Sequence, residues 1–276
     1  MSAHELDHLA IAVRSWSPAG ELLNRELGAR WASGFEMPVF SPCQLALADD
    51  MRIELLEPGT AADSFIGRFL DEHDGNAAPH HITFKVEDIH AAIAGAQQAG
   101  IEPILVNLEH PQWQEAFLHP RDTGLGFLAQ MVRAPRSIEE LTGQDDQWTT
   151  PCPWEQVAGE PKQLQVVYGQ VENLERARTV LVQVLGAREF PVAGKGAGFA
   201  WNEGADLVLH EVPAGTKETG IRAIGVAEPG SIREPGAYPP DIREVLESGT
   251  PHPELGLRIS PLKVNALAAD AQSTGA

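Results

Sequence analysis

The segment APHHITFKVEDIHAAIAGAQQAG, residues 78–100, carries the two patterns on which the fold depends. Apolar and polar side chains alternate in its first part, which is the period of a strand with one buried face. Asp88 then begins a segment with apolar side chains at helical spacing, and Gly100 stands where such a helix ends. The segment therefore predicts a strand followed by a helix, with His80 on the core face of the strand and His81 on the opposite face.

The same order of elements precedes this segment. Residues 5–13, ELDHLAIAV, predict a strand, and a helix follows with Pro18 in its first turn and leucines along one face. Three short extended segments come after each helix, near residues 30–36, 42–48 and 51–57 in the first copy and near 103–107, 114–118 and 125–132 in the second. Residues 1–133 are therefore predicted to form a module of two strand–helix–three-strand units.

A second module is predicted after a linker. Residues 134–162 are polar and contain several prolines, which is typical of a linker. Residues 163–171, QLQVVYGQV, predict a strand, and residues 173–187 predict an amphipathic helix capped by Asn173. A hairpin is predicted over residues 199–213.

The last quarter of the chain departs from this pattern. A fourth copy begins at residues 220–230, but Pro- and Gly-rich sequence separates it from a last strand near 255–262. We therefore predict an α+β fold of tandem βαβββ motifs in two modules, the second of them degenerate. The modules cover residues 1–133 and 163–264, and residues 265–276 form a tail.

The chain of 276 residues has a formal net charge of −19. Nucleic acids and anionic membrane surfaces are bound through basic patches, so this charge argues against both as partners. No apolar segment approaches the length of a membrane span, and the N-terminus lacks the pattern of a signal peptide. Cys43 and Cys152, the only cysteines, have no metal-finger spacing. We therefore expect a cytoplasmic protein with free thiols.

Four predicted strands each place one polar side chain on the face opposite the core. In residues 5–13, for example, His8 lies opposite the face of Leu9 and Ile11. The four residues are His8, Glu54, His81 and Gln130. In a curled sheet they would converge. Two imidazoles, a carboxylate and an amide oxygen suit a divalent transition metal, with positions left open for water or substrate.

The competing interpretation is structural, because a single His or Glu on a strand is commonly a hydrogen-bonded surface residue. The second module provides a comparison. Aligning the repeats without gaps places Val166, Val208, Ile221 and Ser260 opposite His8, Glu54, His81 and Gln130, respectively. Folding of this scaffold therefore does not require a polar set at these positions. The comparison favours a metal site in the first module and a metal-free partner role for the second.

Four motifs carry a resemblance to a known superfamily: LDHLAIAV, IELLEPG, HHITFKVEDI and HPRDTGLGFLAQMV. Residues 5–133 resemble the vicinal oxygen chelate superfamily of glyoxalases, bleomycin resistance proteins and dioxygenases, and most closely its methylmalonyl-CoA epimerase branch. Residues 163–262 resemble a second, diverged copy. The resemblance implies paired βαβββ motifs in a cupped sheet and a divalent metal, Mn, Co, Ni, Fe or Zn. The ligands that it implies are His8, Glu54, His81 and Gln130.

Three positions depart from the superfamily pattern. Gln130 stands where the superfamily usually has Glu, Glu54 where the epimerases often have Gln, and Gln44 about where an epimerase holds a catalytic carboxylate. Fewer bases are then available for moving a proton next to a carbonyl, so Glu54 is predicted to be a metal ligand, a base or both. Lys85 is expected to be a solvated side chain at the sheet margin.

The resemblance implies a metal-dependent isomerase, epimerase or lyase that acts on a small oxygenated substrate through an enolate-like intermediate. A first alternative is a metal-free protein that binds or sequesters a small molecule, which Gln44 and Gln130 favour. An extradiol-type dioxygenase ranks last, because it would require Glu at the place of Gln130. The second module can replace a dimer partner, so both a monomeric pseudo-dimer and a homodimer are compatible with the sequence.

Overall fold

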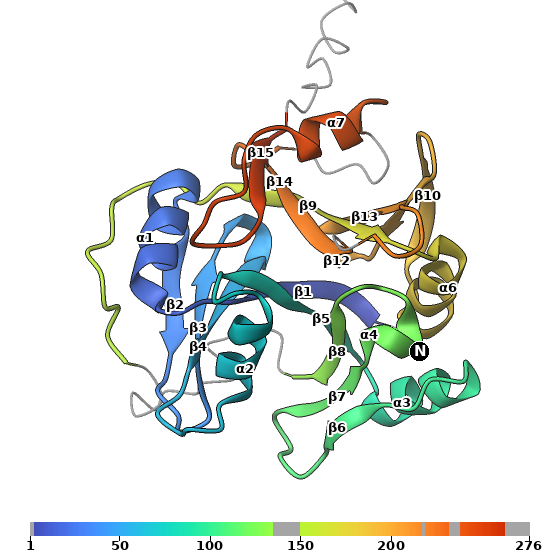
Figure 1. Ribbon diagram of the computed structural model, residues 1–276, viewed down its shortest axis with the longest axis horizontal. Coiled ribbons are helices and arrows are strands. Elements are labelled where there is room, and N and C mark those ends of the chain that lie inside the picture. The colour runs from blue at the N-terminus through green and yellow to red at the C-terminus, as the bar shows by residue number, and fades with distance from the viewer. Residues whose placement is uncertain (1–2, 135–149, 217–218, 232–237, 263–276) are drawn as a thin grey trace, which may run out of the picture.

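The computed structural model describes residues 3–134, 150–216, 219–231 and 238–262 of the chain. These residues form two mixed β-sheets that pack on each other (Figure 1). The predicted α+β fold of tandem βαβββ motifs is confirmed. No helix in the described parts of the chain combines the length and apolarity needed to cross a membrane.

Two βαβββ units that follow each other in the chain form the first sheet. The first unit consists of β1 (Ala3–Ala12), α1 (Trp16–Leu27), β2 (Arg30–Gly34), β3 (Phe40–Ala46) and β4 (Arg52–Pro58). The second consists of β5 (Ala78–Val86), α3 (Ile89–Gln98), β6 (Ile104–Asn107), β7 (Gln114–Leu118) and β8 (Leu128–Arg133). The connections contain the short helices η1 (Ala48–Asp50), α2 (Phe65–Glu72) and α4 (Pro120–Thr123).

Local sequence explains where the two long helices begin and end. Helix α1 buries Leu23 and Leu27 and ends at Gly28, whose φ of 63° is the left-handed conformation that glycine adopts most readily. At the start of α3 the Asp88 carboxylate accepts hydrogen bonds from the backbone N–H groups of His90 and Ala91. Both helices lie where the sequence predicts them.

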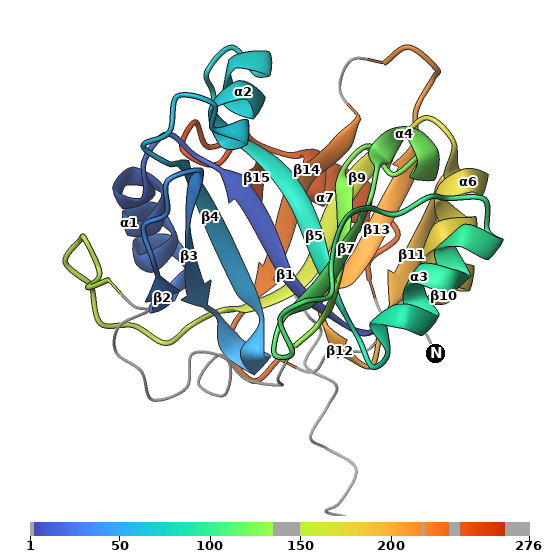
Figure 2. The same cartoon turned by 90° about the horizontal axis from the view of Figure 1, so that it is seen from below.

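The first sheet is cupped, and its strands run in the order β2-β3-β4-β1-β5-β8-β7-β6. Strands β1 and β5 pair antiparallel at the centre, and the two arms of the sheet curve away from them to the same side (Figures 1 and 2). Leu9, Ile82 and Phe84 belong to the core on the convex face. Because side chains alternate along a strand, His8 and His81 point to the concave face.

The second sheet repeats the design incompletely. Its elements are β9 (Gln163–Val171), α6 (Leu174–Thr179), β10 (Arg188–Val192), β11 (Gly196–Ala200), β13 (Asp206–Glu211), β14 (Gly220–Ala227), α7 (Ile242–Glu247) and β15 (Arg258–Pro261). The strand order is β10-β11-β13-β9-β14-β15. Among the described residues, no strands correspond to β6 and β7, so only one arm is complete. The predicted degeneracy of the final quarter is confirmed.

Two details of the second module differ from the sequence prediction. The helix expected over residues 173–187 is an α-helix only over α6, and the chain then continues as a π-helical turn, η3 (Val180–Val184). In addition, Ala223 rather than Ile221 corresponds to His81. Tyr168 in β9 corresponds to Ala10 in β1. Tyr168 pairs with Ala223, just as Ala10 pairs with His81. A register shift between Ile221 and Ala223 caused the error.

The convex faces of the two sheets share one apolar core. At its centre the rings of Phe84, from β5, and Trp201, from the second module, lie 4.9 Å apart. The short strand β12 (Glu203–Gly204) also crosses from the second module to pair with β1. Gly204 has a φ of 83°, and a Cβ there would lie 1.9 Å from the carbonyl oxygen of Leu6. Only glycine therefore permits this close approach of the two modules.

Helix α2 lies on the concave side of the first sheet, and the sequence patterns did not predict it. Its residues Ile66 and Leu70 pack against Ala10, Ala12 and Leu56 of the sheet. The small side chains of β1 leave room for the helix at this end of the cup. The concave face is thus half covered by α2, and the other half carries the polar residues described below.

Residues 150–162 of the predicted linker are among the described residues, whereas residues 135–149 lie outside them. Residues 150–162 run along α1 and β2 without regular secondary structure. The backbone N–H of Thr150 donates to the carbonyl of Gly34, and that of Lys162 donates to Leu27. Trp154 is buried, its ring centroid 5.2 Å from that of Trp31, and its indole fills the space above Gly20.

Replacing Trp154 by alanine should lower the free energy of unfolding by about 3 kcal/mol, because it leaves a cavity between α1 and Trp31. Urea denaturation followed by circular dichroism would measure the change. Val157→Ala is the matched control, since Val157 is 62% exposed in the same segment. Equal stability of the two variants would show that the segment contributes nothing to the fold.

Candidate metal centre

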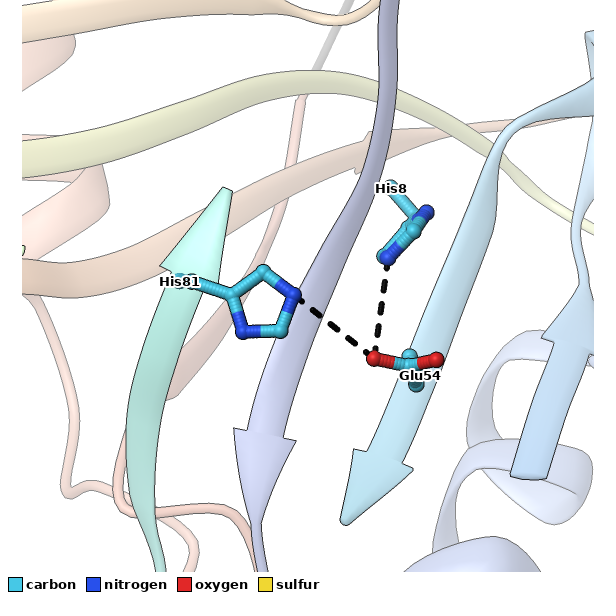
Figure 3. Close-up of side chains that lie close together, drawn as sticks. All are labelled: His8, Glu54 and His81. Atoms are coloured by element: carbon cyan, nitrogen blue, oxygen red, sulfur yellow. Dashed lines mark ion pairs between the residues drawn. The ribbon is translucent and has the colours of Figure 1, made fainter. Parts of the chain in front are cut away.

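Three of the four predicted residues converge on the concave face of the first sheet. His8 extends from β1, Glu54 from β4 and His81 from β5, and their side chains point toward one another (Figure 3). Glu54 and His81 both pair with Ala10, one on each side of β1, and His8 lies two residues earlier on the same face. The β1 register therefore places the three side chains around one point.

The distances within this group suit a shared cation. The Oε2 atom of Glu54 lies 3.6 Å from His8 Nε2 and 3.7 Å from His81 Nε2. One potential ligand atom from each of the three residues lies within 4.8 Å of the others. Glu54 has 13% of its side chain exposed, whereas the two imidazoles are buried. The carboxylate is thus the member of the group most accessible to a substrate.

The second ring nitrogen of His8 is held by a buried carboxylate. His8 Nδ1 lies 2.6 Å from Asp7 Oδ2. A carboxylate accepts but does not donate, so Asp7 keeps a proton on Nδ1 and leaves Nε2 to face Glu54. Burial opposes protonation of the ring, but Glu54 and Asp7 together raise the pKa of His8 to about 9.

Asp7 is itself paired with two cations, Arg52 and Lys85. Its Oδ1 accepts a hydrogen bond from Arg52 and lies 2.7 Å from Lys85 Nζ. Burial by itself raises the pKa of Asp7, but the hydrogen bond with His8 and the charges of Arg52 and Lys85 hold it well below its usual range. Lys85 was expected to be solvated, and that expectation is wrong: it is 4% exposed. A buried charge needs such partners.

His81 is neutral and keeps a free nitrogen toward Glu54. Burial, together with the nearby rings of His80 and His8, holds the pKa of His81 well below its usual range. Its Nδ1 lies 2.9 Å from Nδ1 of His80, whereas its Nε2 is buried and has no hydrogen-bond partner among the described residues. A buried polar atom without a partner is uncommon and calls for a ligand or water.

The position of His80 corrects the strand-parity prediction. A register shift between β1 and β5 beside Pro79 turns His80 away from the convex core. Its ring instead packs against Phe65 and Phe69 of α2, with centroids 6.1 and 4.7 Å apart. His80 therefore packs on the concave side, next to the ligand candidates, rather than in the convex core. Burial lowers the pKa of His80 to about 4.

Gln130, the fourth predicted ligand, lies at the edge of this group. Its Oε1 accepts a hydrogen bond of 2.5 Å from Thr83 Oγ1, which is also 2.9 Å from His8 Nε2. Its Nε2 donates to Glu115 Oε2 over 2.6 Å. On the other arm, Gln44 Nε2 is 3.5 Å from Glu54 Oε1. Sequence reasoning missed Asp7, Thr83 and Glu115, of which only Asp7, adjacent to His8, left a local signal.

The residues present fit a divalent metal. Two imidazoles and a carboxylate are the donors that first-row transition metals prefer, and His81 Nε2 is left without another partner. The Asp7–His8 pair also matches the arrangement in which a metal-binding histidine donates its other N–H to a carboxylate.

Comparisons with known proteins bear on the first module. Residues 7–117 match the family described as Glyoxalase/Bleomycin resistance protein/Dioxygenase superfamily. The chain carries a domain of this superfamily. His8, Glu54 and His81 all lie within the matched residues of this glyoxalase-superfamily domain. Among curated proteins, none is significantly similar in sequence to the chain.

Several solved structures are similar to about half of the chain. A hypothetical protein from Bacillus halodurans is 27% identical, covering 49% of this chain and 97% of its own, with a TM-score of 0.43. Methylmalonyl-CoA epimerase from Mycobacterium tuberculosis is 24% identical, covering 49% and 93%, with a TM-score of 0.42. A variant of the Streptomyces coelicolor epimerase, in complex with 2-nitronate-propionyl-CoA, is 25% identical, covering 48% and 99%, with a TM-score of 0.43.

The charge cluster around Asp7 extends to Glu5, which lies 3.4 Å from Lys85 Nζ. Burial and the charges of Asp7 and Glu203 raise the pKa of Glu5 to about 7, although Lys85 and Arg52 oppose the shift. The folded pKa is therefore above the unfolded value of about 4.3. Protonated Glu5 stabilises the fold, and this contribution is lost as the pH rises toward the folded pKa.

Glu5→Gln should consequently gain stability relative to wild type between roughly pH 5 and roughly pH 8, by on the order of 2 kcal/mol. Urea denaturation of the chelator-treated proteins at both pH values would measure it. Titration of the histidines is common to both proteins and cancels in the difference. Exposed Glu72→Gln should show no such trend. If the stability of Glu5→Gln relative to wild type fell as the pH rose, the ionised form of Glu5 would not be unfavourable in the folded protein.

Proposed function

We propose that the first module holds a divalent metal, Mn, Co, Ni, Fe or Zn, through His8, Glu54, His81 and Gln130. The module would act as an isomerase, epimerase or lyase on a small oxygenated substrate, through an enolate-like intermediate. The observation that carries the proposal is the convergence of His8, Glu54 and His81 within 4.8 Å, with no hydrogen-bond partner for His81 Nε2 among the described residues.

A metal bound there would supply Lewis-acid polarisation of a substrate oxygen. Glu54 would remove the proton from the carbon next to that polarised carbonyl, since it is the accessible carboxylate of the group. Gln44, which lies beside it, is neutral and cannot serve as a second base. Lys85 and Arg52 are engaged with Asp7, so their role is to position His8 rather than to contact substrate.

Helix α2 would exclude water from one side of the reaction. Phe65 and Phe69 pack against His80, which contacts His81, so the apolar face of α2 adjoins the ligand group. On the other side the ring of Phe117 lies 5.9 Å from that of His81. Removing water strengthens electrostatic interactions at the reacting atoms.

The two modules would divide the work. We assign the metal site to residues 1–133, the connection to 134–162 and a metal-free partner role to 163–264. The described residues of this last segment cover the convex face of the first sheet. Residues 265–276, the predicted tail, lie outside the described residues. A monomer would then already contain the equivalent of a dimer interface, although a further homodimer is compatible with this arrangement.

Metal content is the first test. Wild-type protein incubated with Co²⁺ and then desalted should retain about one ion per chain, and His81→Ala should lose most of it because a ligand is removed. Elemental analysis would measure both. His90→Ala is the control, since His90 is an exposed histidine on α3. Wild type that retains none of the proposed metals would exclude the metal-dependent reaction and favour a metal-free binding protein.

Proton abstraction is the second test. Cobalt-loaded protein in D₂O should exchange the carbon-bound protons of hydroxyacetone, followed by proton NMR. Glu54→Gln should keep the ion, because an amide oxygen can ligate, but slow the exchange by roughly 10²- to 10⁴-fold through loss of the base. Exchange at the wild-type rate in this variant would exclude Glu54 as the base.

A further inference from the structure

A chain of polar contacts leads from His8 to a carboxylate on the far arm of the cup. Thr83 Oγ1 lies 2.9 Å from His8 Nε2 and donates to Gln130 Oε1, and Gln130 Nε2 donates to Glu115 Oε2. Trp113 Nε1 donates to the same Glu115 oxygen over 2.9 Å. Thr83 is buried, and Gln130 is 5% exposed. The amide of Gln130 is therefore held at both ends.

The direction of these bonds is set by Glu115. An ionised carboxylate has no proton to donate, so the group that faces Glu115 must be the NH₂ end of the Gln130 amide. The oxygen end is then turned toward Thr83 and His8. Without this constraint the two ends of an amide are nearly equal in size and exchange places easily. An NH₂ group turned toward the centre could not ligate a metal.

We propose that Glu115 is the positioning residue that turns the amide oxygen of Gln130 toward the His8, Glu54 and His81 group. This role rests on the metal site proposed above, in which Gln130 can be the fourth ligand only if its amide oxygen faces the other three. The hydrogen bond from the Gln130 NH₂ group to a carboxylate also increases electron density on the amide oxygen, which makes that oxygen a stronger metal ligand. Glu115 thus supplies negative charge to the centre without contacting the metal.

Glu115→Gln tests the proposal directly. A second glutamine can either donate to or accept from Gln130, so the amide loses its fixed orientation. Affinity for Co²⁺, measured by isothermal titration, should fall by about tenfold. The control is Glu109→Gln, which removes the same charge from an exposed position near β7 and should leave the affinity unchanged.

The Gln130→Glu background should reverse the sign of this effect. There, Glu115 would face another carboxylate at hydrogen-bond distance and repel it, whereas glutamine at 115 would donate to it. The double variant, Gln130→Glu with Glu115→Gln, should therefore bind Co²⁺ more tightly than Gln130→Glu alone. A role of Glu115 in general stability would lower affinity in both backgrounds, and that result would overturn the proposal.

A measurement on the metal-free protein separates this inference from the proposed function. The side-chain NH₂ signals of Gln130, assigned by their absence in Gln130→Glu, should be protected from solvent exchange in wild type and lose protection in Glu115→Gln. Unprotected signals in wild type would overturn the positioning role. If they are protected but wild type binds no Co²⁺, the metal proposal fails while the hydrogen bond stands, and Glu115 then has only a structural role.

Discussion

The buried carboxylate of Asp7 is the interaction on which the candidate site depends. It accepts from His8 and is paired with Arg52 and Lys85, so one side chain joins the three central strands β1, β4 and β5. Two buried cations compensate for the cost of removing Asp7 from water. Because the cluster determines which nitrogen of His8 faces Glu54, it couples the stability of the sheet to the chemistry of its concave face.

The second module covers the convex face of the first sheet and leaves the concave face for the candidate site. Its sheet closes the apolar core behind β1 and β5, where Phe84 meets Trp201. Its own concave face is filled: Tyr168 is buried there and donates to Glu247 of α7. Among the described residues, the His and Glu side chains clustered closely enough to hold a metal ion all lie in the first module. The concave face is thus lined by polar side chains in the first module and filled by packed side chains in the second.

Local pattern was sufficient for most elements but not for their contacts. The strands that carry His8, Glu54, His81 and Gln130 were predicted because alternation of apolar residues is a local property. Lys85 was misplaced because its burial depends on Asp7, which lies far away in the sequence and on the neighbouring strand. The faces of His80 and Ile221 were misjudged because a register shift changes strand parity without a visible signal in the chain.

The sequence by itself determined the repeat of βαβββ units, the acidic character of the chain and the four polar positions on one face of the first sheet. Periodicity and composition are enough for these features, since each depends on neighbouring residues. Only the tertiary structure decided that His8, Glu54 and His81 meet. It also decided that Asp7 contacts His8 and that Glu115 contacts Gln130. Such meetings depend on the register and curvature of strands far apart in the chain, which no local pattern encodes.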